Sequence, residues 1–125
     1  MILDTSAIVA VLKAEPHAGW VVARLPGHVL RMSWVNVAEL ALVASNDLAI
    51  SPEEVFLQIA PFGIEFLQPD EGIVALVARA RERFPLNFGD CFAYAHAKLR
   101  NEALLTLDDD FLKTDLAQVL HPDRD

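Results

Sequence analysis

Three carboxylates stand alone in long apolar stretches of this sequence. Asp4, Glu39 and Asp90 are the only charged residues in the segments 1–12, 32–46 and 84–97, respectively, when histidines are counted as neutral. An ionised carboxylate in an apolar environment is costly unless it is paired. No Lys or Arg lies beside any of the three in sequence, so a partner must come from elsewhere in the fold or from a bound cation.

Asp108 is a fourth candidate, because it opens the acidic run 108–110 directly after an apolar segment. Carboxylates that lie close together repel one another. A hard divalent cation such as Mg²⁺ or Mn²⁺, which prefers oxygen ligands, removes this repulsion. One or two such cations activate water and stabilise the transition state of phosphodiester hydrolysis. Asp4, Glu39, Asp90 and Asp108 therefore predict a metal site that acts on phosphate esters and needs no histidine or thiolate.

A structural role is the alternative for each of these acids. The three aspartates stand where helices are expected to begin, and aspartate is a common N-cap residue. Glu39 lies in the middle of a helical pattern with Asn36 on the same side, so it cannot be a cap. It could instead pair with a distant arginine such as Arg31 or Arg79, as buried acids usually do.

Short apolar runs alternate with helical patterns along the chain. We expect strands at 1–3, 29–32, 64–67, 103–107 and 118–120. We expect helices at 5–12, 16–25, 34–44, 69–84 and 90–101, and a further helix that begins after Ser51. This alternation is typical of an α/β fold with a parallel sheet and helices on both faces. The length of 125 residues fits a single domain that spans 1–125.

The expected sheet brings part of the acidic set to one edge. Asp4 and Asp108 each follow a strand, and ligands of parallel sheets bind beyond the carboxyl ends of the strands. Helices that start at Thr5 and Asp90 direct backbone N–H groups to the same region. We therefore expect the acids to meet in a crevice at this edge.

Composition limits the class of protein. The net charge is −8 and 54% of the residues are hydrophobic, which predicts a packed core and argues against a passive nucleic-acid binder with a basic face. It does not argue against an enzyme that reaches phosphates through bound cations. The single cysteine, Cys91, excludes an intrachain disulfide and is expected to be buried. We find no secretory signal and no membrane-spanning run, and we expect a cytoplasmic protein.

Four motifs, taken in order, resemble those of PIN-domain ribonucleases of the VapC toxin type. They are the segments 2–7 (ILDTSA), 36–40 (NVAEL), 86–95 (LNFGDCFAYA) and 104–111 (LLTLDDDF), the last followed by Thr114 and Asp115. No single motif is decisive, but together they form a specific signal that covers nearly the whole chain. The resemblance implies a three-layer αβα sandwich around a short parallel sheet.

The resemblance also implies roles for individual residues. Asp4 and Asp90 match the principal metal ligands, Glu39 matches a third acid that binds metal or positions water, and Asp108 matches the fourth. Asp109 or Asp110 could share the role of Asp108. The polar positions that line the pocket in this family correspond to Thr5, Ser6 and Thr106.

The function implied by the resemblance is that of a toxin. It is a Mg²⁺- or Mn²⁺-dependent endoribonuclease of a type II toxin–antitoxin system. The expected partners are an RNA substrate, a second copy of the chain in a homodimer, and a VapB-like antitoxin that forms a heterotetramer or a larger assembly with it. No membrane is involved.

Other functional classes are alternatives to a toxin nuclease. A catalytically inactive PIN-like module that binds protein or RNA is an alternative, although such a module would be expected to lose its acids. A phosphoaspartate receiver or a dehalogenase-like phosphatase fits poorly, because the phosphatase requires a second Asp at the position of Ser6. Arg79, Arg81 and Arg83 lie on one expected helix and form either a solvated face or a contact to RNA.

Overall fold

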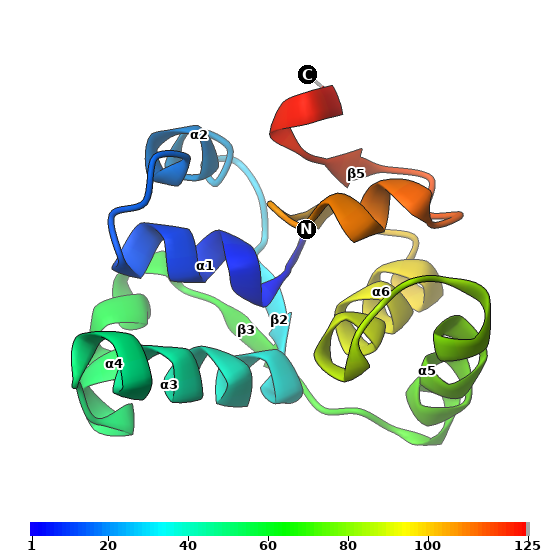
Figure 1. The fold of residues 1–125 in the computed structure, drawn as a ribbon, viewed down its shortest axis with the longest axis horizontal. Helices are drawn as coiled ribbons and strands as arrows, with labels where there is room; N and C mark the ends of the chain where they lie inside the picture. Colours follow the sequence, from blue (N-terminus) through cyan, green and yellow to red (C-terminus); the bar gives the residue numbers. More distant parts are fainter. Residues whose placement is uncertain (125) are drawn as a thin grey trace.

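The protein is built on a five-stranded parallel sheet in a computed structural model that describes residues 1–124 (Figure 1). The strands follow the spatial order β3-β2-β1-β4-β5. Their bounds are β1 (Ile2–Leu3), β2 (Arg31–Ser33), β3 (Glu65–Leu67), β4 (Leu104–Leu105) and β5 (Val119–Leu120). All neighbouring pairs are parallel, and Ile2 at the centre is in register with both Arg31 and Leu104.

Helices connect the strands and cover both faces of the sheet. They are α1 (Thr5–Leu12), α2 (Ala18–Ala23), α3 (Trp34–Leu48), α4 (Pro52–Ile59), α5 (Glu71–Arg83) and α6 (Phe88–Arg100). Short 3₁₀ turns are η1 (Ala60–Phe62), η2 (Asp109–Lys113) and η3 (Pro122–Arg124). Figure 1 shows α1, α3 and α4 on one side of the molecule and α5 and α6 on the other. The expected α/β architecture, with helices around a short parallel sheet, is confirmed.

The central strands are buried on both faces, and their side chains alternate between two cores. Ile2 and Leu104 point to the core under α5 and α6, where they meet Phe111. Leu3 and Leu105 point to the core under α1, α3 and α4. All five side chains are fully buried. This double burial explains why the strands read as continuous apolar runs rather than as alternating patterns.

Most helix starts follow the capping signals in the sequence. Ser33 accepts a hydrogen bond from the Val35 N–H, and Ser51 accepts one from the Glu54 N–H. The helix α3 runs to Leu48, past the expected end at residue 44. It stops at Ala49, whose φ of 54° places a non-glycine residue in the left-handed region, so no glycine marks this end in the sequence.

The start of α6 corrects a prediction. We expected this helix to begin at Asp90, but it begins at Phe88, and Asn87 is the N-cap. Asp90 is therefore the third residue of the helix. Asn87 and Asp90 form a capping box, in which the Asn87 side chain accepts the Asp90 N–H at 2.8 Å and the Asp90 side chain accepts the Asn87 N–H at 3.2 Å.

No helix within residues 1–124 is both long enough and apolar enough to cross a bilayer.

Candidate active site

β1 and β4 lie side by side at the centre of the sheet. From β1 the chain adds β2 and β3 outward on one side, and it then crosses to the other side to add β4 and β5. In open parallel sheets such a switch point leaves a crevice beyond the carboxyl ends of the two strands. Asp4 follows β1 directly, and Thr106 and Asp108 follow β4. The crevice therefore lies beside Asp4, Thr106 and Asp108, which were predicted from the sequence as site residues.

Asp4 is held by hydroxyl groups rather than by cations. Its Oδ2 atom accepts a hydrogen bond from the Ser6 hydroxyl at 2.7 Å and another from the Thr106 hydroxyl at 2.9 Å. The Ser6 Oγ also accepts the Leu107 N–H at 3.0 Å. These bonds fix the Asp4 side chain across the junction of β1 and β4. Asp4 occupies the N-cap position of α1, but its side chain makes no capping hydrogen bond.

The other oxygen of Asp4 is left without a partner. Asp4 is 2% exposed, and its Oδ1 atom is buried with no hydrogen bond to any described residue. Burial, with smaller contributions from the charges of Asp108 and Glu39, raises the pKa of Asp4 to about 6, and the hydrogen bonds from Ser6 and Thr106 act against this rise. A buried, unpartnered carboxylate oxygen is costly unless a cation binds it.

Asp90 is the second strongly perturbed acid. It is 6% exposed, and burial raises its pKa to about 7, with the charge of Asp4 as the next contribution and the Asn87 N–H acting against the rise. The charges of Asp108 and Glu39 also raise the pKa of Asp90. The acids of the pocket therefore repel one another, which a bound cation would relieve.

Glu39 is oriented by neutral groups. Its Oε1 atom accepts the Thr5 hydroxyl at 2.7 Å and the Asn36 amide at 2.8 Å. Asn36 is fully buried and also donates to the Gly89 carbonyl at 3.0 Å, which ties α3 to the start of α6. Arg31, proposed as an alternative partner of Glu39, pairs instead with Glu102 at 2.7 Å and with Glu65 at 3.5 Å.

Gly89 makes room for Glu39. A Cβ atom at residue 89 would overlap the Glu39 carboxylate. Only glycine therefore allows the Glu39 carboxylate to lie against the first turn of α6. From the sequence, Asn36 was expected only to be a neighbour of Glu39, and Gly89 had no expected role, since both contacts form only when α3 and α6 pack together.

The acidic run after β4 divides between two environments. Asp108 caps η2, because its Oδ1 atom accepts the Asp110 N–H at 2.9 Å, and the same residue also lines the pocket. Carboxylate oxygens of Asp90, Asp108 and Asp110 all lie within 4.8 Å of one another. Asp109 faces away from this group, with its Oδ1 atom 3.0 Å from the Nε2 atom of His121. Of the two residues considered beside Asp108, the geometry favours Asp110.

One open pocket of about 300 Å³ joins these groups. The predicted site residues that line this pocket are Asp4, Thr5, Ser6, Glu39, Asp90 and Asp108. Thr106 lies beneath them, fully buried. Glu15 also lines the pocket. It was missed because Glu15 belongs to the turn after α1, where an acid beside a proline carries no distinctive signal.

The donor set fits a hard divalent cation. It consists of carboxylate oxygens from four elements or their junctions, and one of these oxygens is buried and unpartnered at Asp4. No thiol or imidazole lies among the lining residues. Oxygen-only sets of this kind suit Mg²⁺ or Mn²⁺ rather than zinc.

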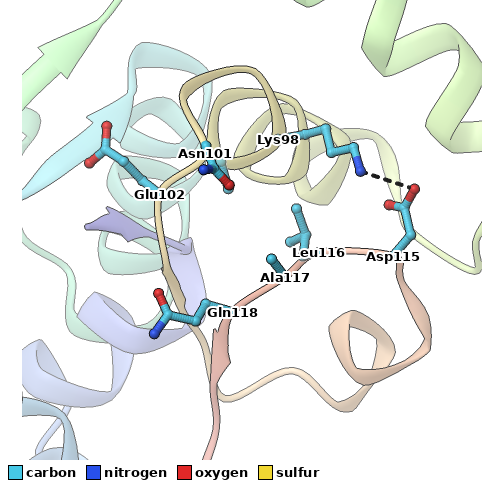
Figure 2. A pocket seen from close by; sticks show the side chains of 8 residues that line it. Lys98, Asn101, Glu102, Asp115, Leu116, Ala117 and Gln118 are labelled. Carbon is cyan, nitrogen blue, oxygen red and sulfur yellow. Dashed lines mark hydrogen bonds and ion pairs between the residues drawn. The ribbon is translucent and has the colours of Figure 1, made fainter.

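A second pocket, of about 190 Å³, lies at the opposite end of α6 and contains none of the four acids (Figure 2). It precedes β4 and β5, so it opens at the amino edge of the sheet. Figure 2 shows the Lys98 ammonium directed at Asp115, with which it pairs at 3.3 Å. Its third charged group, Glu102, pairs with the Met1 amino group, Arg31 and Arg100, so the acids of this pocket are paired with cations, in contrast to those of the crevice at the carboxyl edge.

Comparison with known proteins gives the family. The PIN domain family matches residues 1–116. The chain is 37% identical to ribonuclease VapC36 of Mycobacterium tuberculosis, over 93% of this chain and 91% of that one. It superposes on VapC20 of M. tuberculosis, a toxin that cleaves the sarcin–ricin loop, with a TM-score of 0.79 at 14% identity, covering 95% and 98% of the two chains. For VapBC-1 of nontypeable Haemophilus influenzae the TM-score is 0.69 at 25% identity, covering 96% of each chain.

Each of these matches covers nearly the whole chain. The aligned region includes the ends of β1 and β4, the middle of α3 and the start of α6, from which the acidic pocket is built. This chain is a PIN-domain protein and belongs with the VapC ribonucleases of that family.

Proposed function

We propose that this protein is a metal-dependent endoribonuclease that hydrolyses RNA phosphodiesters at the acidic pocket. The observation that carries the proposal is the convergence on one pocket of acids from the end of β1, from α3, from α6 and from the end of β4, one of which, Asp4, has a buried and unpartnered oxygen. Such a pocket binds RNA only when its negative charge is neutralised, and a divalent cation does this.

Asp4, Glu39, Asp90 and Asp108, with Asp110 beside them, are the groups that would hold Mg²⁺ or Mn²⁺. The bound cation would lower the pKa of a water molecule and neutralise the charge that develops on the phosphate. Asp4 offers its free Oδ1 atom, while Ser6 and Thr106 hold its other oxygen in place. The hydroxyl groups therefore fix the orientation of the Asp4 carboxylate at the wall of the pocket.

Glu39 is suited to orienting the attacking water. Thr5 and Asn36 both bind its Oε1 atom, and no hydrogen bond from residues 1–124 is found at Oε2. The Oε2 atom can therefore accept a proton of a water molecule in the pocket. Because Gly89 and Asn36 fix the carboxylate from two sides, the water would be held in one position relative to the phosphate, which favours hydrolysis.

In the cell, we propose that the protein is the toxin of a toxin–antitoxin pair with a VapB-like partner. Two of the similar proteins support this proposal: VapC36 is a ribonuclease, and the similar H. influenzae structure is that of VapBC-1. An antitoxin segment that carries Arg or Lys would suit this pocket, because its cations would replace the metal. The homodimer remains a prediction from the family resemblance.

Cleavage of total RNA by the purified protein tests the activity. We expect cleavage with Mg²⁺ or Mn²⁺, none with EDTA, and none by Asp90→Asn. The matched control is Asp47→Asn, which removes a carboxylate from an exposed residue outside the pocket and should leave cleavage unchanged. If folded wild-type protein freed of antitoxin cleaves no RNA with either metal, the proposal fails and a non-catalytic binding module becomes the better description.

A further inference from the structure

The acidic pocket continues between α1 and α3, which both begin at the carboxyl edge of the sheet and pack against each other (Figure 1). Helix α1 lines the pocket with Thr5 and, one turn later, with Val9. Helix α3 lines it with Glu39 and, one turn later, with Val43. Both valines are half-buried. The pocket therefore has a polar end at Thr5 and Glu39 and an apolar part at Val9 and Val43.

Glu15 is turned back onto the pocket by the way α1 ends. The Glu15 N–H donates to the Ala10 carbonyl at 2.8 Å, and the Ala14 N–H donates to the Val11 carbonyl at 3.3 Å. These bonds form a Schellman motif, in which Ala14, with a φ of 52°, occupies the left-handed position that usually holds glycine. An alanine in this conformation costs about 1 kcal/mol. Pro16 restricts the backbone of Glu15 from the other side, so the residue is held firmly where it lines the pocket.

The Glu15 carboxylate is available to a ligand. Its side chain is 42% exposed, and its one ion pair within residues 1–124 is with the Lys13 ammonium, 4.0 Å away. Lys13 lies closer to Asp47, at 2.8 Å. No hydrogen bond from the described part of the chain is found at either oxygen of Glu15. Both oxygens can therefore accept hydrogen bonds from a molecule in the pocket.

Glu15 stands apart from the acids that would hold the metal. The carboxylates whose oxygens lie within 4.8 Å of one another are those of Asp90, Asp108 and Asp110. At a rise of about 1.5 Å per residue, Val9 lies about 7 Å beyond Asp4 along the axis of α1, and Glu15 follows the end of that helix. A metal bound by the aspartates therefore leaves the Glu15 carboxylate free for another part of the substrate.

An apolar wall that ends in a free carboxylate suits a nucleobase. The planar base packs on apolar side chains, and in single-stranded RNA its Watson–Crick edge is open to hydrogen bonds. A carboxylate accepts N–H donors at such an edge. Guanine presents two adjacent donors, N1–H and the N2 amino group, which match the two oxygens. Cytosine and adenine present one amino group each, and uracil presents one donor between two oxygens that a carboxylate repels.

We propose that Val9, Val43 and Glu15 form a binding site for a nucleobase of the RNA next to the cleaved phosphate, and that Glu15 selects guanine over uracil there. The inference rests on the proposed function, since it places an RNA phosphate at the metal end of the pocket. Phosphate and base then occupy different parts of one pocket of about 300 Å³. Glu15 is a specificity residue in this arrangement, whereas the aspartates hold the cation.

Binding of free nucleotides tests the base site without relying on cleavage. Guanosine and uridine monophosphates, with the phosphate at the 3′ or the 5′ position, are titrated with Mg²⁺ by calorimetry or NMR. We expect guanosine monophosphate to bind the wild type about fivefold to tenfold more tightly, the lower range for a bidentate contact because Glu15 is partly exposed. In Glu15→Gln this preference should disappear through weaker guanosine binding, because the amide replaces one acceptor by a donor.

The matched control is Glu53→Gln, which removes a carboxylate from an exposed residue of α4 that does not line the pocket. It should keep the guanine preference. Circular dichroism checks that both variants are folded.

The same preference should appear in cleavage. Sequencing the ends of the fragments from total RNA gives the base frequencies on either side of each cut. The wild type should enrich guanine and deplete uracil at one position beside the cut. Glu15→Gln should reduce this enrichment by about fivefold, while Glu53→Gln retains it.

The outcomes separate the base site from the nuclease. Metal-dependent cleavage with no guanine preference, or with a preference that Glu15→Gln retains, would refute the base site and leave the nuclease intact. A Glu15-dependent preference for guanosine monophosphate in a wild type that cleaves no RNA would support the base site and refute the nuclease. Equal weakening of both nucleotides in Glu15→Gln would assign Glu15 to the metal or the phosphate and overturn the inference.

Discussion

Replacing Asp90 by Asn should stabilise the metal-free protein. Burial and the charge of Asp4 raise the pKa of Asp90 from 3.8 to about 7, a shift of about three units. Each unit corresponds to about 1.4 kcal/mol, so the ionised carboxylate destabilises the fold by about 4 kcal/mol at about pH 8. The carboxamide of Asn removes this charge and keeps an acceptor for the Asn87 N–H, but it buries an unpaired NH₂ group, which costs about half of the gain.

We therefore expect a net stabilisation of about 2 kcal/mol, or a rise in Tm of roughly 6–10 °C for a chain of this length. The effect has a definite pH dependence. The folded-state pKa is raised, so the wild type is most stable below about pH 4 and loses stability as the pH rises through about 7. The advantage of the variant should grow over this window and shrink towards acid pH. Saturating Mg²⁺ should stabilise the wild type alone and reduce or reverse the difference.

Thermal unfolding followed by circular dichroism in EDTA, at several pH values, measures this. Asp47→Asn is the control, because Asp47 forms an exposed pair with Lys13 at 2.8 Å, and such pairs contribute at most about 1 kcal/mol. A lower Tm for Asp90→Asn at alkaline pH would refute the reasoning and assign Asp90 a mainly structural role in the capping box. A Tm difference that does not change with pH would refute it as well.

Three further predictions concern the pocket. Gly89→Ala should abolish cleavage by displacing the Glu39 carboxylate, while circular dichroism shows a folded protein; full activity would mean that the position of Glu39 is unimportant. Asp110→Asn should raise the Mg²⁺ concentration that half-saturates cleavage by about tenfold, whereas Asp109→Asn should leave it unchanged; equal effects would contradict the division of the acidic run. Mg²⁺ at about 100 times its Kd should stabilise the wild type by about 2.7 kcal/mol in unfolding experiments, and a Tm independent of metal would count against the site.

The sequence predicted the architecture well because its strongest signals are local. The helix Thr5–Leu12 has the expected bounds, and each expected strand exists, although shorter than its apolar run. Parallel strands buried on both faces read as apolar runs whose ends have no polar marker, so β4 was expected to extend to residue 107 and ends at Leu105. The 3₁₀ turns were not expected, because turns this short leave no periodic pattern.

The acids of the site could be selected from the sequence, but the groups that hold them could not. An isolated charge in an apolar segment is visible in the sequence, and this signal found Asp4, Glu39 and Asp90. The contacts between Asn36 and Gly89 and between Ser6 and Leu107 join segments far apart in the chain. The separation of Asp109 from Asp110 depends on the turn of η2, which the run of three aspartates does not encode.

The central position of β1 also affects when the acidic pocket is completed during synthesis. Asp4 leaves the ribosome long before its hydrogen-bond partner Thr106 and the acids at 108 and 110, which follow only when β4 is added beside β1. A nascent chain that has folded as far as α6 still lacks one wall of the pocket. This order of assembly delays completion of the pocket until β4 has been added, and it leaves chains that terminate before β4 without a finished site.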